Sequence, residues 1–257
     1  MLLVVDIGNT NITLGVFDND ERKMIARMAT LVNKTADQYA VELIQILNIY
    51  DVSKEDIDGC IVSSVVPVVT NAIKKALSLI KVKKTLFVGP GVKTGLDIKI
   101  DNPAQLGADL VVGAVAAIKL YKMPCIILDL GTATTLSVLD KNGAFLGGPI
   151  CAGVGISLEA LTSKTSQLPQ ISVETPKSVI GKNSVDSMKA GLVLGSACMI
   201  DGLIERVENE IGKVATVVAT GGLAPEVVKN CKKDIIINDN LLLDGLKAIY
   251  EKNINFN

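Results

Sequence analysis

An internal repeat constrains the fold of this 257-residue chain more than any other feature of its sequence. The segment LLVVDIGNTNITLGVFDND near the start resembles CIILDLGTATTLSVLDKNG in the middle, provided that the alignment leaves a one-residue gap after the turn. In each copy an aspartate, Asp6 or Asp129, ends a hydrophobic strand and precedes a glycine and a threonine-bearing turn. Such self-similarity indicates duplicated structural units. We therefore expect an α/β protein with two lobes of similar plan, residues 1–122 and 123–257, and a cleft between them.

Strands and helices follow each copy of the repeat in a similar order. Apolar runs rich in β-branched residues predict strands, and apolar residues at helical spacing predict helices. The expected strands are 2–6, 12–17, 61–66, 85–88, 125–129, 134–139, 214–219 and 235–237. The expected helices start near 35, 67 and 103, lie before 169 and after 222, and span 184–211 and 241–252. The glycine-containing segments 89–102 and 147–155 are typical of a long loop and a turn.

The absence of histidine removes several kinds of active site. Without imidazole there can be no Ser-His-Asp triad, no histidine metal cluster and no imidazole general base. A proton acceptor near neutral pH must then be a carboxylate, a lysine or a perturbed cysteine. The five scattered cysteines contain no CxxC pair, which favours buried reduced thiols over a disulfide framework or a zinc site.

Charge and hydropathy narrow the expected partners. The formal net charge is −1 with both signs interspersed, and there is no tryptophan, so neither a nucleic acid nor a membrane surface is an expected partner. The apolar runs 110–120 and 190–200 are shorter than the roughly 20 residues of a membrane span. Met1 leads directly into an apolar strand without a basic segment, which predicts a cytoplasmic protein.

Both turns of the repeat carry groups that suit a phosphate and a cation. Gly8 lets a phosphate approach the backbone closely, and Asp6 can hold Mg²⁺ through water. The neutral side-chain donors nearby are Asn9, Thr10, Asn11 and Thr13. In the second copy, Asp129 can bind a cation and Thr132 can donate to a phosphate. The same residues also suit two plain hairpins whose turn aspartates are satisfied locally.

Phosphoryl transfer to a hydroxyl also needs a carboxylate that orients the hydroxyl or accepts its proton. Asp109 in NPAQLGADL is the best candidate, because Gly107 and Ala108 beside it leave room for a substrate. Spacing alone favours another interpretation, an aspartate in an early helix turn stabilised by the helix dipole. The glycines of ATGGLAP, Gly221 and Gly222, would let adenine or ribose approach the backbone, or form a simple strand–helix turn.

Taken in order, the segments DIGNTN, NPAQLGAD, DLGTATT, GGPICAGVGIS, PKSVIGKNSVDSMKAG and ATGGLAP resemble the type III pantothenate kinases, essentially from end to end. That family belongs to the superfamily of acetate and sugar kinases, heat-shock chaperones and actin. The resemblance implies two actin-like, ribonuclease H-like lobes, each a mixed sheet flanked by helices, with an ATP cleft between them. It implies a kinase that uses ATP to convert pantothenate to 4'-phosphopantothenate, the first step of coenzyme A synthesis. It also implies Mg²⁺, a monovalent cation (K⁺ or NH4⁺) and a homodimer.

The resemblance also assigns roles to individual residues. The nucleotide and Mg²⁺ loop would be Asp6, Ile7, Gly8, Asn9, Thr10, Asn11, Ile12 and Thr13, with Thr132, Gly221 and Gly222 as further nucleotide contacts. Asp109 would be the base on the pantothenate hydroxyl, and Asp129 would bind the monovalent cation. The pantothenate contacts would be Ile100, Gly107, Ala108, Asp109, Leu110 and Ser184.

Three of these positions depart from the family pattern, which usually has arginine at Leu110, tyrosine at Ile100 and threonine at Ser184. Losing a charge-assisted bond to the pantothenate carboxylate costs roughly 1.5–3 kcal/mol, or about 10- to 150-fold in affinity. Lys93 or Lys99 could replace the missing charge. Two alternative functions therefore stay open: a paralogue that phosphorylates another small hydroxyl compound, and a nucleotide-binding accessory or regulatory protein with weak turnover.

Overall fold

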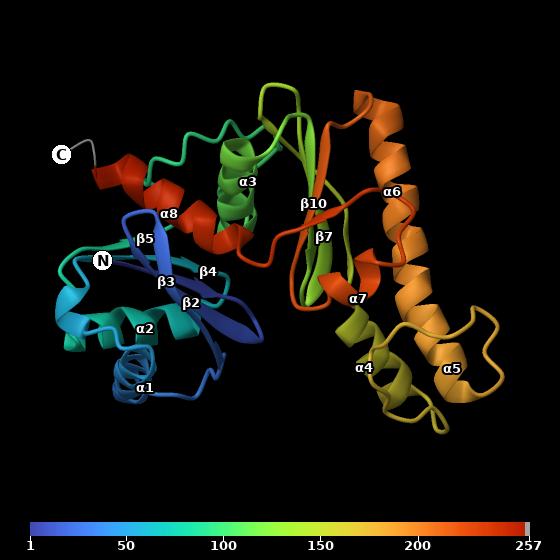
Figure 1. Cartoon of the computed structure of the whole chain (residues 1–257), viewed down its shortest axis with the longest axis horizontal. Helices are drawn as coiled ribbons and strands as arrows, with labels where there is room; N and C mark the ends of the chain where they lie inside the picture. Colours follow the sequence, from blue (N-terminus) through green and yellow to red (C-terminus); the bar gives the residue numbers. More distant parts are fainter. Residues whose placement is uncertain (255–257) are drawn as a thin grey trace. The chain divides into compact units, whose positions relative to one another are not determined.

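The computed structural model describes residues 1–254, and the described chain divides into two compact units, each containing one β-sheet (Figure 1). The first unit contains Met1–Gly95, Ala104–Lys119 and residues 241–254. The second contains Leu96–Pro103 and Leu120–Asn240. This division differs from the expected lobes, 1–122 and 123–257, at the segment 96–103, at residues 120–122 and at the C-terminal helix.

Sheet A of the first unit is mixed. Its strand order is β3-β2-β1-β4-β5, from β1 (Leu2–Ile7), β2 (Asn11–Asp18), β3 (Glu21–Ala29), β4 (Gly59–Ser64) and β5 (Thr85–Phe87). Strand β1 runs antiparallel to β2 and parallel to β4. The hairpin β1–β2 is the first copy of the repeat, and β3, which the sequence analysis did not predict, extends it to the sheet edge.

Helices cover both faces of sheet A because successive side chains of a strand point to opposite sides. Leu3 and Val5 pack with α1 (Ala36–Ile49) and α2 (Pro67–Leu79). Val4 packs on the other face with α3 (Ala108–Leu120) and α8 (Leu241–Ile254). Figure 1 shows α8, in red, beside the blue N-terminal strands. The C-terminal helix therefore belongs to the first unit because it completes that unit's core.

Local signals place the first two helices as predicted. The Thr35 hydroxyl accepts a hydrogen bond from the Gln38 amide, and the Gln38 side chain accepts one from the Thr35 amide, which forms a capping box. Pro67 occupies the first turn of α2, where its missing N–H costs nothing.

Helix α3 starts later than predicted. Pro103 opens only a 3₁₀ turn, Pro103–Gln105, and the α-helix begins at Ala108. Gly107 separates the two, as expected for a residue with low helix propensity, and its carbonyl accepts the amide hydrogen of Val111. The predicted helix start near 103 was wrong for the α-helix, and the observed start at Ala108 places Asp109 in the first turn.

Sheet B of the second unit is also mixed. Its order is β11-β10-β6-β7-β8, with β9 paired to β7, from β6 (Cys125–Leu130), β7 (Ala133–Leu139), β8 (Phe145–Gly147), β9 (Ile150–Ala152), β10 (Thr216–Thr220) and β11 (Ile236–Ile237). The short strand β9 lies inside the predicted turn 147–155, which is therefore partly extended. The loop segment 96–103 joins this unit because Ile98 bridges to Phe145 and the Lys99 amide donates to the Phe145 carbonyl.

One face of sheet B packs against α4 (Val154–Lys164), α7 (Ala224–Val228) and a long helical segment. That segment comprises α5 (Ser184–Lys189), a π-helical turn at Ala190–Leu194 and α6 (Gly195–Ile211). Within residues 1–254 it is the one helix long and apolar enough to cross a membrane by length and composition. Its residues Ala197, Ile200 and Ile204 are buried in the core of sheet B, which is how a core helix of a globular unit packs.

Candidate functional site

The first turn of the repeat lies at the end of β1 and is tied to the end of β3. The Gly8 amide donates to the Asn11 carbonyl at 3.0 Å, which closes the turn. Thr30, directly after β3, donates from its hydroxyl to the Gly8 carbonyl at 2.7 Å, and its amide donates to the Thr10 carbonyl at 2.9 Å. The side chains of Asn9, Thr10 and Asn11 are exposed. Thr30 therefore fixes a polar turn whose tip faces solvent, and sequence reasoning missed it together with β3.

Two residues assigned to this loop point elsewhere. The side chains of Ile7 and Ile12 are fully buried in the core that α1 and α2 share with the sheet. Asp6 and Thr13 are register partners across β1–β2 and point to the opposite face, the one covered by α3 and α8. Only the backbone of Ile7 and Ile12 is therefore available to a ligand, whereas Asp6 and Thr13 can present side chains.

The second turn of the repeat is one residue shorter than the first. Here the Gly131 amide donates to the Ala133 carbonyl at 3.1 Å. Asp6 pairs with Thr13 across the first hairpin and Asp129 pairs with Thr135 across the second, so the spacing falls from seven residues to six. This difference is the one-residue gap that the sequence alignment required.

Three glycines allow close packing around Asp129 and its turn: Gly131 within the turn, and Gly221 and Gly153 from other chain segments. A Cβ added to Gly221, which has φ +99°, would lie 2.6 Å from the Leu130 backbone and 2.8 Å from Asp129 Oδ1. A Cβ on Gly131 would lie 3.3 Å from the same oxygen. A Cβ on Gly153, the N-cap of α4, would lie 2.2 Å from the Thr132 carbonyl oxygen. The predicted residues Asp129, Thr132 and Gly221 thus converge at one end of sheet B, next to the N-terminus of α4.

We expect Gly221→Ala to destabilise the protein by about 2–4 kcal/mol, because the new methyl meets a left-handed backbone conformation and the Leu130 backbone together. Urea denaturation measures the change in the free energy of unfolding. Gly222→Ala is a matched control, since nothing lies within 4 Å of the added Cβ and the φ of Gly222 is not positive. Equal stabilities of the two variants would contradict the close approach described above.

Asp109 lies in the first turn of α3 with a partly buried side chain. Its Oδ1 accepts a 2.8 Å hydrogen bond from the Leu110 amide. A Cβ on Gly107 would lie 2.5 Å from that same oxygen, so the glycine provides the space that the carboxylate fills. Burial raises the pKa of the Asp109 carboxyl, although the backbone amides of Leu110 and Asp109 itself act in the opposite direction. A carboxylate with a raised pKa is better suited to accept a proton near neutral pH than an exposed aspartate.

Asp109 and the first turn share one face of one sheet. Helix α3 contributes Val112 to the core that also contains Val4 of β1 and Ile61 of β4. Asp6 alternates with Val4 on its strand, so its side chain points to the same face. The first unit therefore carries the predicted base and the predicted Mg²⁺ carboxylate on the same side of sheet A.

Two buried hydroxyl oxygens have no hydrogen-bond partner in the described chain, Ser63 Oγ and Thr135 Oγ1. Each belongs to a strand neighbour of a repeat aspartate: Ser63 is the register partner of Asp6, and Thr135 is that of Asp129. An unsatisfied buried hydroxyl costs about 1–3 kcal/mol. Both occur at the strand ends where a ligand was predicted. Among residues 1–254, no three His, Cys, Asp or Glu side chains gather as a metal cluster.

The predicted acceptor residues Leu110 and Ile100 are both half-buried. Leu110 follows Asp109 in α3, and Ile100 packs its Cγ2 against Gly147, 3.4 Å from where a Cβ on that glycine would lie. Lys99 forms an exposed 2.9 Å ion pair with Asp97. Exposed pairs contribute little, about 0–1 kcal/mol, so this pairing does not prevent Lys99 from binding another anion.

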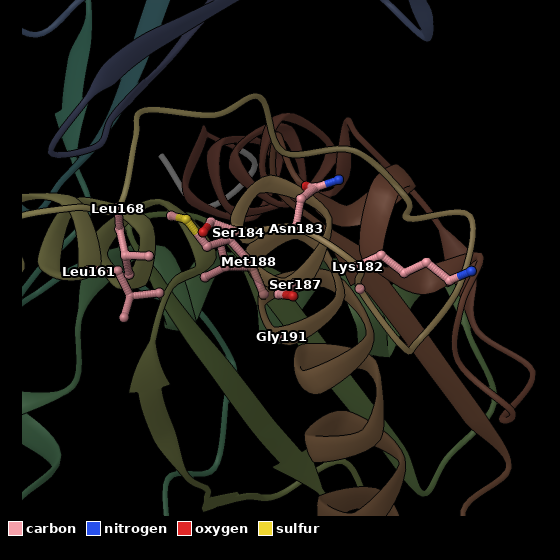
Figure 2. A pocket seen from close by; sticks show the side chains of 10 residues that line it. Leu161, Leu168, Lys182, Asn183, Ser184, Ser187, Met188 and Gly191 are labelled. Atoms are coloured by element: carbon pink, nitrogen blue, oxygen red, sulfur yellow. The ribbon is translucent and has the colours of Figure 1, made fainter.

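Ser184 lies on the wall of a pocket in the second unit, with a volume of about 740 Å³ (Figure 2). Asn183 caps α5 by accepting from the Asp186 amide at 2.9 Å, which leaves the Ser184 hydroxyl out of the cap. Leu161 and Leu168 lie at one side of the pocket in Figure 2, and the Lys182 ammonium extends away from them. The full lining is Leu161, Leu168, Gly181, Lys182, Asn183, Ser184, Ser187, Met188, Gly191 and Leu192.

The wall formed by Gly191 and Leu192 belongs to the π-helical turn. Such turns are often found at functional sites. Sequence reasoning identified Ser184 but missed the rest of this pocket, because no residue pattern marks where a helix widens by one residue.

Comparison with known proteins agrees with these motifs. A family model described as type III pantothenate kinase matches residues 2–206. The chain is 42% identical to a type III pantothenate kinase of Geobacillus sp. (strain WCH70), with 99% of this chain and 98% of that protein covered. It is 42% identical to another of Syntrophus aciditrophicus (strain SB), with 98% and 100% covered.

Among solved structures, the activator of 2-hydroxyisocaproyl-CoA dehydratase from Clostridium difficile with bound ADPNP has a TM-score of 0.59 at 16% identity. The match covers 99% of this chain and 96% of that one. At this identity the likeness concerns the fold alone. It confirms the expected fold class, α/β with actin-like, mixed sheets flanked by helices.

Proposed function

Since the chain belongs to the type III pantothenate kinase family, we propose that it transfers the terminal phosphoryl group of ATP to the hydroxyl of pantothenate. The products are ADP and 4'-phosphopantothenate, and the reaction opens coenzyme A synthesis. The observation that carries the proposal is Asp109: a partly buried carboxylate with a raised pKa, which accepts a hydrogen bond from the Leu110 amide and fills the space that Gly107 leaves beside it.

Asp109 orients the acceptor hydroxyl and accepts its proton as the oxygen attacks the γ-phosphorus. The bond from that phosphorus to the β–γ bridging oxygen breaks, and ADP leaves with the electron pair. The protein's other contribution is positioning, which supplies most of the rate enhancement in phosphoryl transfer. The loop from Gly8 to Thr13 holds the phosphates with its backbone and with the side chains of Asn9, Thr10, Asn11 and Thr13.

The residues present fit the cations that this family implies. Asp6 offers one carboxylate beside the unpartnered Ser63 hydroxyl, which suits a hydrated Mg²⁺ bound mostly through phosphate and water. Mg²⁺ bound with ATP supplies charge neutralisation at the transferring phosphoryl group. Asp129 lies beside the unpartnered Thr135 hydroxyl, and such neutral and anionic oxygens suit K⁺ or NH4⁺. Gly221 and Gly222 would lie against the nucleoside, with Thr132 donating to a phosphate.

The acceptor would contact Gly107, Ala108 and Leu110 beside the base, and Ile100 and Ser184 elsewhere. We propose that the protein acts in the cytoplasm as a homodimer. Leu110 and Ile100 support a second candidate, a kinase for a less anionic small hydroxyl compound, since neither half-buried apolar side chain can pair with a carboxylate.

A kinase assay tests the proposal. Purified protein with ATP, Mg²⁺ and K⁺ is expected to form ADP and 4'-phosphopantothenate, both detected by mass spectrometry. A panel of hydroxyl acceptors with and without a carboxylate separates the two candidates by their kcat/KM ratios. The absence of ADP at saturating pantothenate would refute the first candidate. ADP formation with a neutral acceptor alone would establish the second.

A further inference from the structure

The hydroxyl of Ser63 makes no hydrogen bond that would stabilise the first unit. Its side chain is completely buried, and Oγ has no hydrogen-bond partner. Fully buried positions of a strand are normally occupied by apolar residues. Position 61, two residues earlier on the same face, is an example, since it holds an isoleucine. A buried hydroxyl without a partner opposes folding. The residue is therefore explained better by a partner that arrives with a ligand than by packing.

The position of Ser63 in the sheet indicates which group its hydroxyl can contact. On β4, Ser63 is the parallel register partner of Asp6 on β1. Residues paired in this way project to the same face of a sheet from strands about 4.8 Å apart. That face is the one covered by α3 and α8, and the next polar side chain on it across β2 is Thr13. The hydroxyl thus lies among groups assigned to the nucleotide, with Asp6 as its direct neighbour.

The adjacent residue, Ser64, is a serine at the same strand end whose hydroxyl has a structural role. Ser64 Oγ accepts hydrogen bonds from the Val66 amide at 3.1 Å and from the Thr70 hydroxyl at 2.6 Å. These bonds shape the connection into α2, and they are complete without a ligand. Ser63 makes no such bond, although it is the more deeply buried of the two.

We propose that Ser63 is a positioning residue that donates its hydroxyl hydrogen to the Asp6 carboxylate once that carboxylate holds the nucleotide-bound divalent cation. The hydrogen bond fixes the orientation of the Asp6 carboxylate toward the cation. Outer-shell partners of this type typically change metal affinity by about 10- to 100-fold. The proposal rests on the proposed function, because the cation enters with ATP.

The test is binding of Mn²⁺, which replaces Mg²⁺ and is detected by electron paramagnetic resonance, in the presence of ADP. Ser63→Ala is expected to weaken Mn²⁺ binding about 10- to 100-fold, while ADP binding without metal stays at the wild-type value. Its thermal stability is expected to equal or exceed that of the wild type, because an unsatisfied hydroxyl is removed. Ser63→Cys keeps the side-chain shape with a slightly larger atom, and it tests the same loss of a strong donor if the alanine variant fails to fold.

Ser64→Ala is the matched control. It is expected to lower the melting temperature, because the Val66 and Thr70 hydrogen bonds are lost, and to leave Mn²⁺ binding unchanged. Wild-type Mn²⁺ affinity in Ser63→Ala or Ser63→Cys would overturn the role of Ser63 while leaving the kinase proposal intact. If the wild-type protein itself binds no Mn²⁺ with ADP or ATP, the proposed function fails, and this inference fails with it.

Discussion

Asp109→Asn is expected to lower kcat by about 10²- to 10⁴-fold, the usual contribution of a general base. The amide has similar size and accepts a hydrogen bond from the Leu110 amide, but it cannot take the hydroxyl proton. Steady-state kinetics with pantothenate measure the loss, and calorimetric titration with ATP measures nucleotide affinity, which is expected to stay near the wild-type value. Turnover of Asp109→Asn at the wild-type rate would show that Asp109 is not the general base.

The same substitution is expected to raise stability near neutral pH. Burial raises the folded-state pKa of Asp109 above its ordinary value of 3.8. Between the two pKa values the folded protein binds more protons than the unfolded chain, so stability falls as the pH rises through this window. Above the folded-state pKa, Asp109 is ionised in the folded protein, and the full free-energy cost of burying this charge lowers the stability. The stability advantage of Asp109→Asn should therefore shrink as the pH falls, which urea denaturation at several pH values will show.

This pH dependence also applies to turnover. Protonated Asp109 cannot accept a proton, so kcat/KM of the wild-type enzyme is expected to rise with pH through the raised pKa of this carboxyl. An activity loss in Asp109→Asn without the pH-dependent stability gain would indicate that the carboxylate is not desolvated. Lower activity together with higher stability in Asp109→Asn would indicate that Asp109 serves catalysis and not stability.

Leu110→Arg is expected to lower the KM for pantothenate by about 10- to 150-fold, with little change in kcat. The new guanidinium can pair with the pantothenate carboxylate, a charge-assisted bond worth roughly 1.5–3 kcal/mol. The backbone amide that holds Asp109 is retained, because the substitution changes only the side chain. Initial-rate kinetics over a range of pantothenate concentrations provide the measurement.

Leu110→Gln is the control for this prediction, since it adds polarity and length without charge. A KM that falls equally in both variants would show that hydrogen bonding rather than charge limits affinity. A KM that rises in Leu110→Arg would contradict the proposed contact between the side chain at position 110 and the pantothenate carboxylate.

The repeat predicted the two hairpins and even the length difference between their turns, because tight turns depend on a few adjacent residues. Strand β3 was missed for a different reason. Its buried positions, Met24, Ala26 and Met28, alternate correctly, but methionine and alanine favour helices, and the residues between them, Ile25 and Arg27, break the apolar–polar alternation. Since β3 was missed, so was Thr30, which ties the first turn to the end of that strand.

Candidate site residues could be proposed from the sequence where a motif carries its own chemistry, and they remain predictions. Asp6, Asp129 and Asp109 stand in recognisable segments, and the glycines beside them have a physical reason in the close contacts at Gly221 and Gly107. The buried hydroxyls of Ser63 and Thr135 were not predictable, because nothing in a strand sequence tells which hydroxyl will lack a partner. That property depends on the neighbouring strands and becomes visible only when these are paired.

Helix α8 has a consequence for the order in which the protein folds during synthesis. Leu243, Leu246 and Ile249 cover the face of sheet A that contains Val4 and Ile61, and α3 alone leaves this face partly open until the ribosome has made α8. The second unit, which lies between the segments of the first in the sequence, can fold earlier. The nascent chain thus carries an incompletely covered apolar surface from the formation of sheet A until α8 has been made, and this surface is open to a ribosome-associated chaperone.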